Sequence, residues 1–268
     1  MAADTDHGHA RRSTFMNNGF ILEVCVDSVE SAVAAARGGA HRVELCSSLF
    51  DGGVTPSAGL ITTVRQTISI GLHVMIRPRG ADFCYSDDEF QIMRLDILMA
   101  KQLGADGVVL GILDLDGKVD IRRTKQLFDL AAPMRVTYHR AFDMSADLFA
   151  SLRDLQTMGV HCVLTSGGQQ SAAEGAETLR RLVRASSGST AIMAGGGIED
   201  HNVSTLIERT GVREIHASLK FPVLSPMRYQ NDKISMGPSN GREYQRFVVQ
   251  QEKVQNLLQA ASNGVQKL

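Results

Sequence analysis

The sequence predicts a (β/α)8 barrel, the α/β fold in which eight parallel strands close into a ring and helices cover its outside. Short apolar runs alternate with longer amphipathic stretches along the chain, which is typical of repeated βα units. Eight such units follow Gly19 in about 200 residues, which fits this barrel better than a doubly wound sheet of five or six strands.

Each expected strand is a short run in which apolar residues dominate. The eight runs are 20–26, 41–46, 72–77, 107–111, 135–139, 160–165, 191–194 and 214–217. Helices are expected to follow capping residues, Pro or Gly punctuation. They start at Asp27-Ser28, at Thr55-Pro56 and at Asp87, and later near Asp120, Ser145, Ala172 and Asp200. The first ends at Gly38-Gly39 and the third near Leu103.

The two ends of the chain differ from this repeat. Residues 1–18 are polar and lack an apolar face, so we expect a disordered tail before a single barrel domain over 19–268. The segment 219–241 is rich in Pro, Ser and Asn. A closing helix should follow it, with one apolar face formed by Phe247, Val254, Leu257, Leu258 and Ala261.

Composition excludes several classes of function. A formal charge of -1 and an aromatic content of 5% argue against a nucleic-acid partner. No apolar run reaches the ~20 residues that span a membrane, and no secretory signal is visible. We therefore expect a protein of the cytoplasm, with the nucleus as a second location to test. Its cysteines, Cys25, Cys46, Cys84 and Cys162, are expected as thiols and match no CxxC zinc pattern.

The first two strands carry the same pattern, Glu-x-Cys, in Glu23/Cys25 and Glu44/Cys46. Side chains two apart point to the same side of a strand, and adjacent strands lie ~4.8 Å apart. At equal heights, Cys25 and Cys46 can share one soft metal ion, and Cu(I) is the ion that thiolates select. The alternative is that both are small core residues. Glu23 and Glu44 are expected to face a polar, solvated or ligand-filled mouth, because a buried unpaired carboxylate is costly.

Strands three and five end in residues suited to acid/base chemistry. Arg77 can hold an anion, and His139 can act as a general acid or base beside Glu23 and Glu44. Arg79, Arg140 and Asp143 join them, either as ligand contacts or as supporting ion pairs. The alternative is a closed salt-bridge network without a ligand.

The later strands end in glycines and small residues that expose backbone amides. We expect a ligand, such as a phosphate group, near Ser166, Gly167, Gly195, Gly196 and Gly197, although glycines also serve tight turns. The chain carries neither a P-loop nor a dinucleotide-binding fingerprint.

Six blocks in order resemble the CutC copper homeostasis family across about residues 19–240. They are 23–28 (EVCVDS), 42–46 (RVELC), 75–80 (MIRPRG), 139–143 (HRAFD), 164–167 (LTSG) and 195–198 (GGGI). The resemblance implies a (β/α)8 barrel, an intracellular location and a homo-oligomer, either a dimer or a tetramer. It also implies copper handling, with Cu(I) bound by Cys25 and Cys46.

Three functions remain open from the sequence. The first is a copper homeostasis protein that holds Cu(I) without turnover. The second is a barrel enzyme acting on a small anionic metabolite, such as a phosphorylated one, with Glu23, Glu44 and His139 moving protons and Arg77 holding the anion. The third is a scaffold protein whose barrel mouth is only structural.

Overall fold

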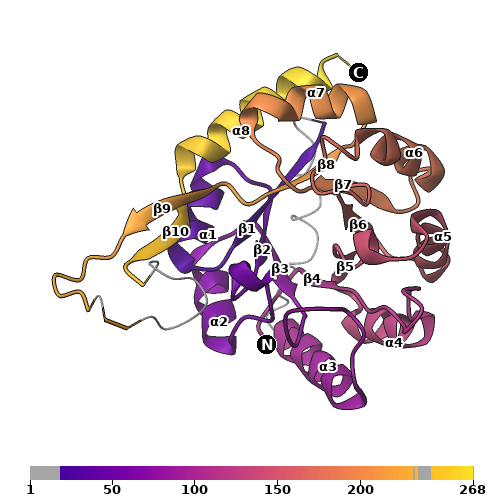
Figure 1. Cartoon of the computed structure of the whole chain (residues 1–268), viewed down its shortest axis with the longest axis horizontal. Helices are drawn as coiled ribbons and strands as arrows, with labels where there is room; N and C mark the ends of the chain where they lie inside the picture. The colour runs from indigo at the N-terminus through magenta and orange to yellow at the C-terminus, as the bar shows by residue number, and fades with distance from the viewer. Residues whose placement is uncertain (1–18, 232, 235–242, 268) are drawn as a thin grey trace, which may run out of the picture.

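Eight parallel strands form a closed barrel in chain order, with β8 pairing back to β1 (Figure 1). The computed structural model describes residues 19–231, 233–234 and 243–267, so the predicted tail at 1–18 lies outside the described residues. The strands are β1 (Ile21–Val26), β2 (Arg42–Leu45), β3 (Gly71–Met75), β4 (Gly107–Leu110), β5 (Arg135–Tyr138), β6 (Cys162–Thr165), β7 (Ala191–Gly195) and β8 (Glu214–Ala217). The predicted (β/α)8 barrel is confirmed.

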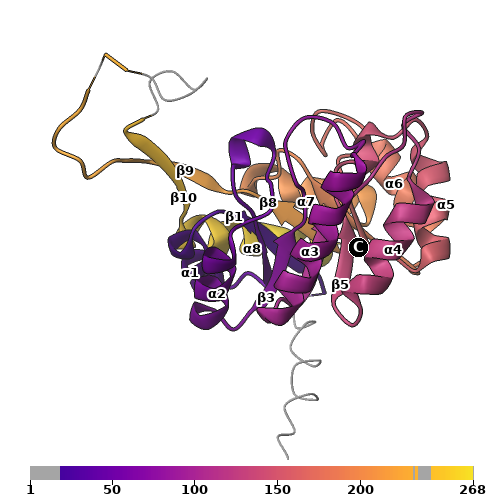
Figure 2. The same ribbon diagram turned by 90° about the horizontal axis from the view of Figure 1, so that it is seen from below.

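Helices surround the barrel and connect successive strands (Figures 1 and 2). They are α1 (Val29–Gly38), α2 (Ala58–Thr67), α3 (Asp87–Gln102), α4 (Ile121–Ala131), α5 (Leu148–Met158), α6 (Ala176–Ser186) and α7 (Asp200–Thr210). Short 3-10 turns, η2 (Leu49–Asp51) and η3 (Phe142–Met144), lie in the loops after β2 and β5. The last helix, α8 (Gln251–Val265), packs against both α7 and α1 and so closes the ring. No described helix is long and apolar enough to cross a membrane.

Capping side chains explain where several helices begin. Ser28 accepts a hydrogen bond from the amide of Ser31, and Ser86 forms a reciprocal capping box with Glu89. The predicted starts near Ser145 and Ala172 are wrong. The fifth helix begins at Leu148 because Asp147 caps it, and η3 takes up part of the preceding loop. The sixth begins at Ala176, after a turn that ends at Gly175.

The segment after β8 forms a hairpin that the sequence did not indicate. β9 (Lys220–Leu224) pairs antiparallel with β10 (Gln245–Val249), and the hairpin extends away from the barrel (Figures 1 and 2). Phe247 lies in β10, with its ring 5.7 Å from that of Phe50, so its assignment to the closing helix is wrong. The buried face of α8 contains Val254, Leu257 and Ala261, as expected.

Alternation along each strand divides the barrel into two environments. Leu22 and Val24 of β1 belong to the main apolar cluster, which also includes buried residues of the surrounding helices. Glu23 and Cys25 alternate with these two residues along β1 and therefore point to the opposite side, into the barrel. The barrel interior is consequently polar, with buried Glu23, Arg42, Glu44 and His73. This polar interior positions the candidate site.

Candidate metal site at the barrel mouth

Cys25 and Cys46 meet near the carboxyl ends of the first two strands. Cys25 is paired in register with Glu44 rather than with Cys46, so the two cysteines do not lie at equal heights in the barrel. Cys46 lies just beyond the end of β2, where its amide donates a hydrogen bond to the carbonyl of Val26. The two sulfur atoms are nevertheless 3.9 Å apart. The stagger of the strands thus leaves the thiols in contact.

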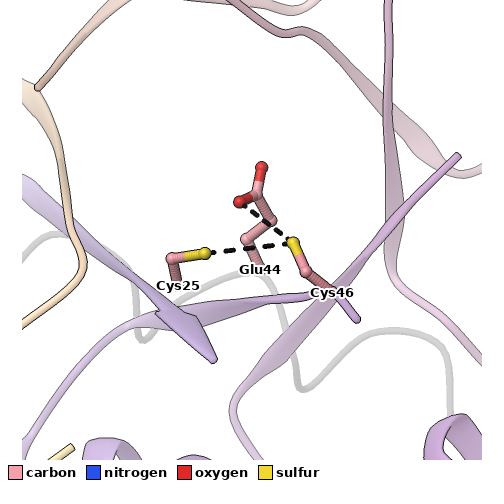
Figure 3. A group of neighbouring side chains, drawn as sticks. All are labelled: Cys25, Glu44 and Cys46. Atoms are coloured by element: carbon pink, nitrogen blue, oxygen red, sulfur yellow. Dashed lines mark hydrogen bonds between the residues drawn. The ribbon is translucent and has the colours of Figure 1, made fainter. Parts of the chain in front are cut away.

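Glu44 completes a compact group with the two thiols (Figure 3). Its Oε2 lies 3.4 Å from the sulfur of Cys46, and one ligand atom from each of the three residues lies within 4.8 Å of the others. All three residues are buried, and Met75 packs against the two cysteines. Gly53 leaves room for this packing, because a Cβ there would lie 3.1 Å from the sulfur of Cys46. The group is therefore shielded from water and rich in sulfur.

His216 from β8 joins this group, although it is absent from the residues predicted from the sequence. Its Nδ1 lies 2.8 Å from Glu23 Oε1 and its Nε2 lies 3.8 Å from Glu44 Oε2. A signal was present, because His216 follows Glu214 by two positions on the last strand and so faces the same side. The side chain is 13% exposed, which makes it the member of the group that reaches the surface.

Burial and charge shift the proton affinities within the group. A hydrogen bond with the Cys46 thiol lowers the pKa of Cys25 well below its usual value. Burial acts to raise this pKa, and His216 acts with Cys46 to lower it. Burial acts to lower the pKa of His216, but Glu44, Cys25 and Glu23 together raise it. Burial, followed by the negative charge of Cys25, raises the pKa of Glu44. The shifts favour the charged forms of Cys25 and His216 and the uncharged form of Glu44, so the three groups titrate together.

A closed ion-pair network lies below the thiols. Arg42 donates to Glu23 and to Glu214, each at 2.6 Å, and His73 Nδ1 lies 3.5 Å from Glu23. The expectation that Glu23 faces a solvated or ligand-filled mouth is wrong, because its side chain is 0% exposed and its oxygens contact Arg42, His73 and His216. Its surroundings are polar, as expected, but they are filled by other side chains. Neither Arg42 nor Glu214 was predicted from the sequence to have this role.

Arg77 and His139 lie against Phe83, just beyond the ends of β3 and β5. Arg77 donates to the carbonyl oxygens of Asp51, Gly53 and Ala81, so most of its guanidinium holds loops together. The Nδ1 of His139 accepts from the amide of Ala141, and its Nε2 is buried without a partner among the described residues. Burial, with the charge of Arg77, lowers the pKa of His139 to about 3. The ring is therefore neutral at physiological pH.

These buried neutral histidines predict a loss of stability in acid. Burial also lowers the pKa of His73 to about 3, so the unfolded chain binds protons near pH 6.5 that the folded protein does not. From pH 6.5 down toward 3, each histidine should remove about 1.4 kcal/mol of unfolding free energy per pH unit. Urea unfolding at several pH values measures this slope, which should become shallower in His139→Gln. The control is His201→Gln, which alters an exposed histidine and should leave the slope unchanged. If His139→Gln also left the slope unchanged, the buried neutral state of His139 would be contradicted.

Of the remaining predicted ligand residues, some support the structure of loops or strands and others line a cavity. Arg79 pairs with Glu89 and Asp82 and clamps its own loop. Asp143 accepts from the amides of Ser166 and Gly168 and pairs with Arg140, which shapes the loop containing Gly167. Gly195 ends β7. Only Arg140, Gly196 and Gly197 of the predicted ligand residues line the cavity beside His216.

Fold and site together define a (β/α)8 barrel protein with a buried cysteine, carboxyl and histidine group at its mouth. The CutC family model matches residues 20–221, and the chain belongs to the CutC family. The "Copper homeostasis protein cutC homolog" of Homo sapiens is 47% identical over 92% of this chain and 90% of its own length. A family protein CutC of Chromobacterium violaceum is 45% identical over 90% of this chain and 97% of its own length.

Solved structures agree with the fold. A crystal structure named for the putative copper homeostasis protein CutC of Streptococcus agalactiae matches with a TM-score of 0.71 and 32% identity, covering 74% of this chain and 98% of that one. A thiamine phosphate pyrophosphorylase from Pyrococcus furiosus matches with a TM-score of 0.57 and 17% identity, over 92% of this chain and 98% of that one. The second likeness concerns the barrel alone.

Proposed function

We propose that this chain is a copper homeostasis protein that binds Cu(I) between Cys25 and Cys46. The observation that carries the proposal is the 3.9 Å separation of two buried thiol sulfurs from adjacent strands. Thiolates are soft ligands that select Cu(I) over harder cations. The copper homeostasis names of the human and mouse relatives, each 47% identical to this chain, support the same function.

The geometry of the sulfur atoms suits a single ion. A separation of 3.9 Å is less than twice a metal–thiolate bond, which is about 2.3 Å for zinc, so one ion can contact both sulfurs without a backbone shift. Met75 packs beside them and offers a soft thioether. Burial and the negative charge of Cys25 raise the pKa of Glu44, which favours its uncharged form and so disfavours hard cations such as Mg²⁺ that need carboxylates. The residues present therefore favour a soft monovalent ion.

The neighbouring side chains prepare the thiols for this ion. His216 helps to keep Cys25 deprotonated, because its positive charge stabilises the thiolate. The hydrogen bond with Cys25, together with burial and the negative charge of Cys25, raises the pKa of Cys46. Binding of Cu(I) would therefore release the proton of Cys46. His216 is 13% exposed and lines the neighbouring cavity, so an incoming ion would approach the sulfurs past this side chain.

Anaerobic titration of Cu(I) against a competing chelator tests the proposal. The full chain should bind one Cu(I) with a Kd below about 1 nM, and the double variant Cys25→Ser, Cys46→Ser should weaken binding by about 100-fold or more. Cys162→Ser is the matched control, because Cys162 is also a buried thiol inside the barrel but packs with Leu164 and Met193 instead. Binding that is weak in the unaltered chain, or that survives in the double variant, would reject the proposal.

The cytoplasmic or nuclear location and the homo-oligomer stay predictions. Fractionation of cells and light scattering of the purified chain measure them.

A further inference from the structure

A cavity opens beside the thiol group, between the loops that follow β7 and β8. Its volume is about 410 Å³, within the range of roughly 300–1,000 Å³ that holds small molecules. Its lining includes Arg140, Gly196, Gly197, His216, Lys220 and Lys253. These residues come from separate segments of the chain, so only the folded barrel brings them together.

Arg140 pairs with Asp143, so the two lysines are the cations of this cavity that can pair with a ligand. Lys220 lies over the ring of Phe50 and Lys253 over that of Phe221, and within the described residues neither lysine forms a salt bridge. The lining also contains two carboxylates, Glu199 and Asp200, which have contacts of their own. Glu199 caps α7, and both lie within 4 Å of the exposed His201. Lys220 also counters the rise in the pKa of the half-buried Asp27, so the two lysines offer positive charge beside, and not in excess of, the neighbouring carboxylates.

Backbone amides add neutral donors to this charge. Gly196 and Gly197 have φ of +101° and +67°, a conformation that favours glycine. Their carbonyl oxygens accept hydrogen bonds from Ala172 and Asn202, but in the described part of the chain their amides donate none. A guanidinium nitrogen of Arg140 lies 3.6 Å from the point where a Cβ on Gly196 would stand. Two glycines with undonated amides and a guanidinium thus line the same cavity.

We propose that this cavity binds a phosphate monoester of a small organic molecule. The phosphate oxygens accept from the amides of Gly196 and Gly197 and pair with Lys220 and Lys253. The organic part extends toward His216, which lines the cavity and contacts the buried thiol group. The site does not depend on copper, because none of these phosphate-binding groups is one of the proposed Cu(I) ligands.

Calorimetry with glycerol phosphate at low ionic strength tests this site on the full chain. We expect a Kd below about 1 mM, and the double variant Lys220→Gln, Lys253→Gln should raise it by about tenfold or more. Lys125→Gln is the matched control, because Lys125 is an exposed lysine of α4 that pairs with Asp129. Its Kd should stay within about twofold of the unaltered chain.

Three further arms make the outcome decisive. Glycerol without phosphate should not bind, whereas inorganic phosphate should compete with the ester. The Cys25→Ser, Cys46→Ser variant should bind glycerol phosphate normally, so failure of the copper proposal and failure of this one are distinguishable. No binding at about 10 mM ester, equal binding of glycerol, or an unchanged Kd in the double lysine variant would overturn the proposal.

Discussion

Replacing Arg42 with Met should lower the free energy of unfolding by about 3–5 kcal/mol. Arg42 is the partner of two buried carboxylates, Glu23 and Glu214, at 2.6 Å each. Burial acts to lower the pKa of Arg42, but these carboxylates raise it, so the guanidinium stays charged inside the barrel. Methionine has a similar length but no charge, and it would leave both carboxylates without their cation. Urea unfolding monitored by circular dichroism measures the loss.

Two comparisons separate this effect from general damage. Arg180→Met removes an exposed ion pair with Glu177 and should cost no more than about 0.5 kcal/mol. Adding Glu23→Gln and Glu214→Gln to Arg42→Met should recover part of the lost stability, because neither of these two carboxylates is then left without its cation. If Arg42→Met cost as little as Arg180→Met, the network would not stabilise the barrel.

Replacing His216 with Gln should shift the ionisation of Cys25 toward higher pH. Glutamine keeps a polar group near Glu23 but removes the positive charge that stabilises the Cys25 thiolate. The hydrogen bond from Cys46, which is the larger cause of the lowered pKa, stays in place in this variant. Part of the shift should therefore persist, and the thiolate fraction near neutral pH should fall without vanishing. The ultraviolet absorbance of thiolate against pH measures this change, and subtraction of the Cys25→Ser curve assigns it to Cys25.

A control variant shows whether the change at Cys25 depends on His216 itself. His201→Gln, which alters an exposed histidine of α7, should leave the titration of Cys25 unchanged. If His216→Gln behaved like this control, the hydrogen bond from Cys46 alone would sustain the thiolate. The role of His216 in stabilising the Cys25 thiolate would then be rejected, while the two-thiolate copper site would still depend on the Cu(I) titration.

Local patterns were sufficient to predict much of the barrel. Each strand reads as a short apolar run, and side chains such as Ser28, Ser86 and Asp120 start helices through bonds to amides within three residues. The hairpin of β9 and β10 was not predicted, because its pairing is not local. Its strands pair across about twenty intervening residues, and no local turn signal specifies that pairing.

The residue pattern of the strands was enough to identify which groups are available to the site: the two Glu-x-Cys strands and the glycines after β7. Which of these groups meet depends on the closed barrel. Its stagger sets Cys25 level with Glu44 yet keeps the two sulfurs in contact, and closure brings His216 of β8 beside β1. Glu23, which the sequence pattern placed at the barrel mouth, is instead paired with Arg42 inside the barrel. Contacts between residues nearly two hundred positions apart follow from strand closure and register, which local sequence patterns do not encode.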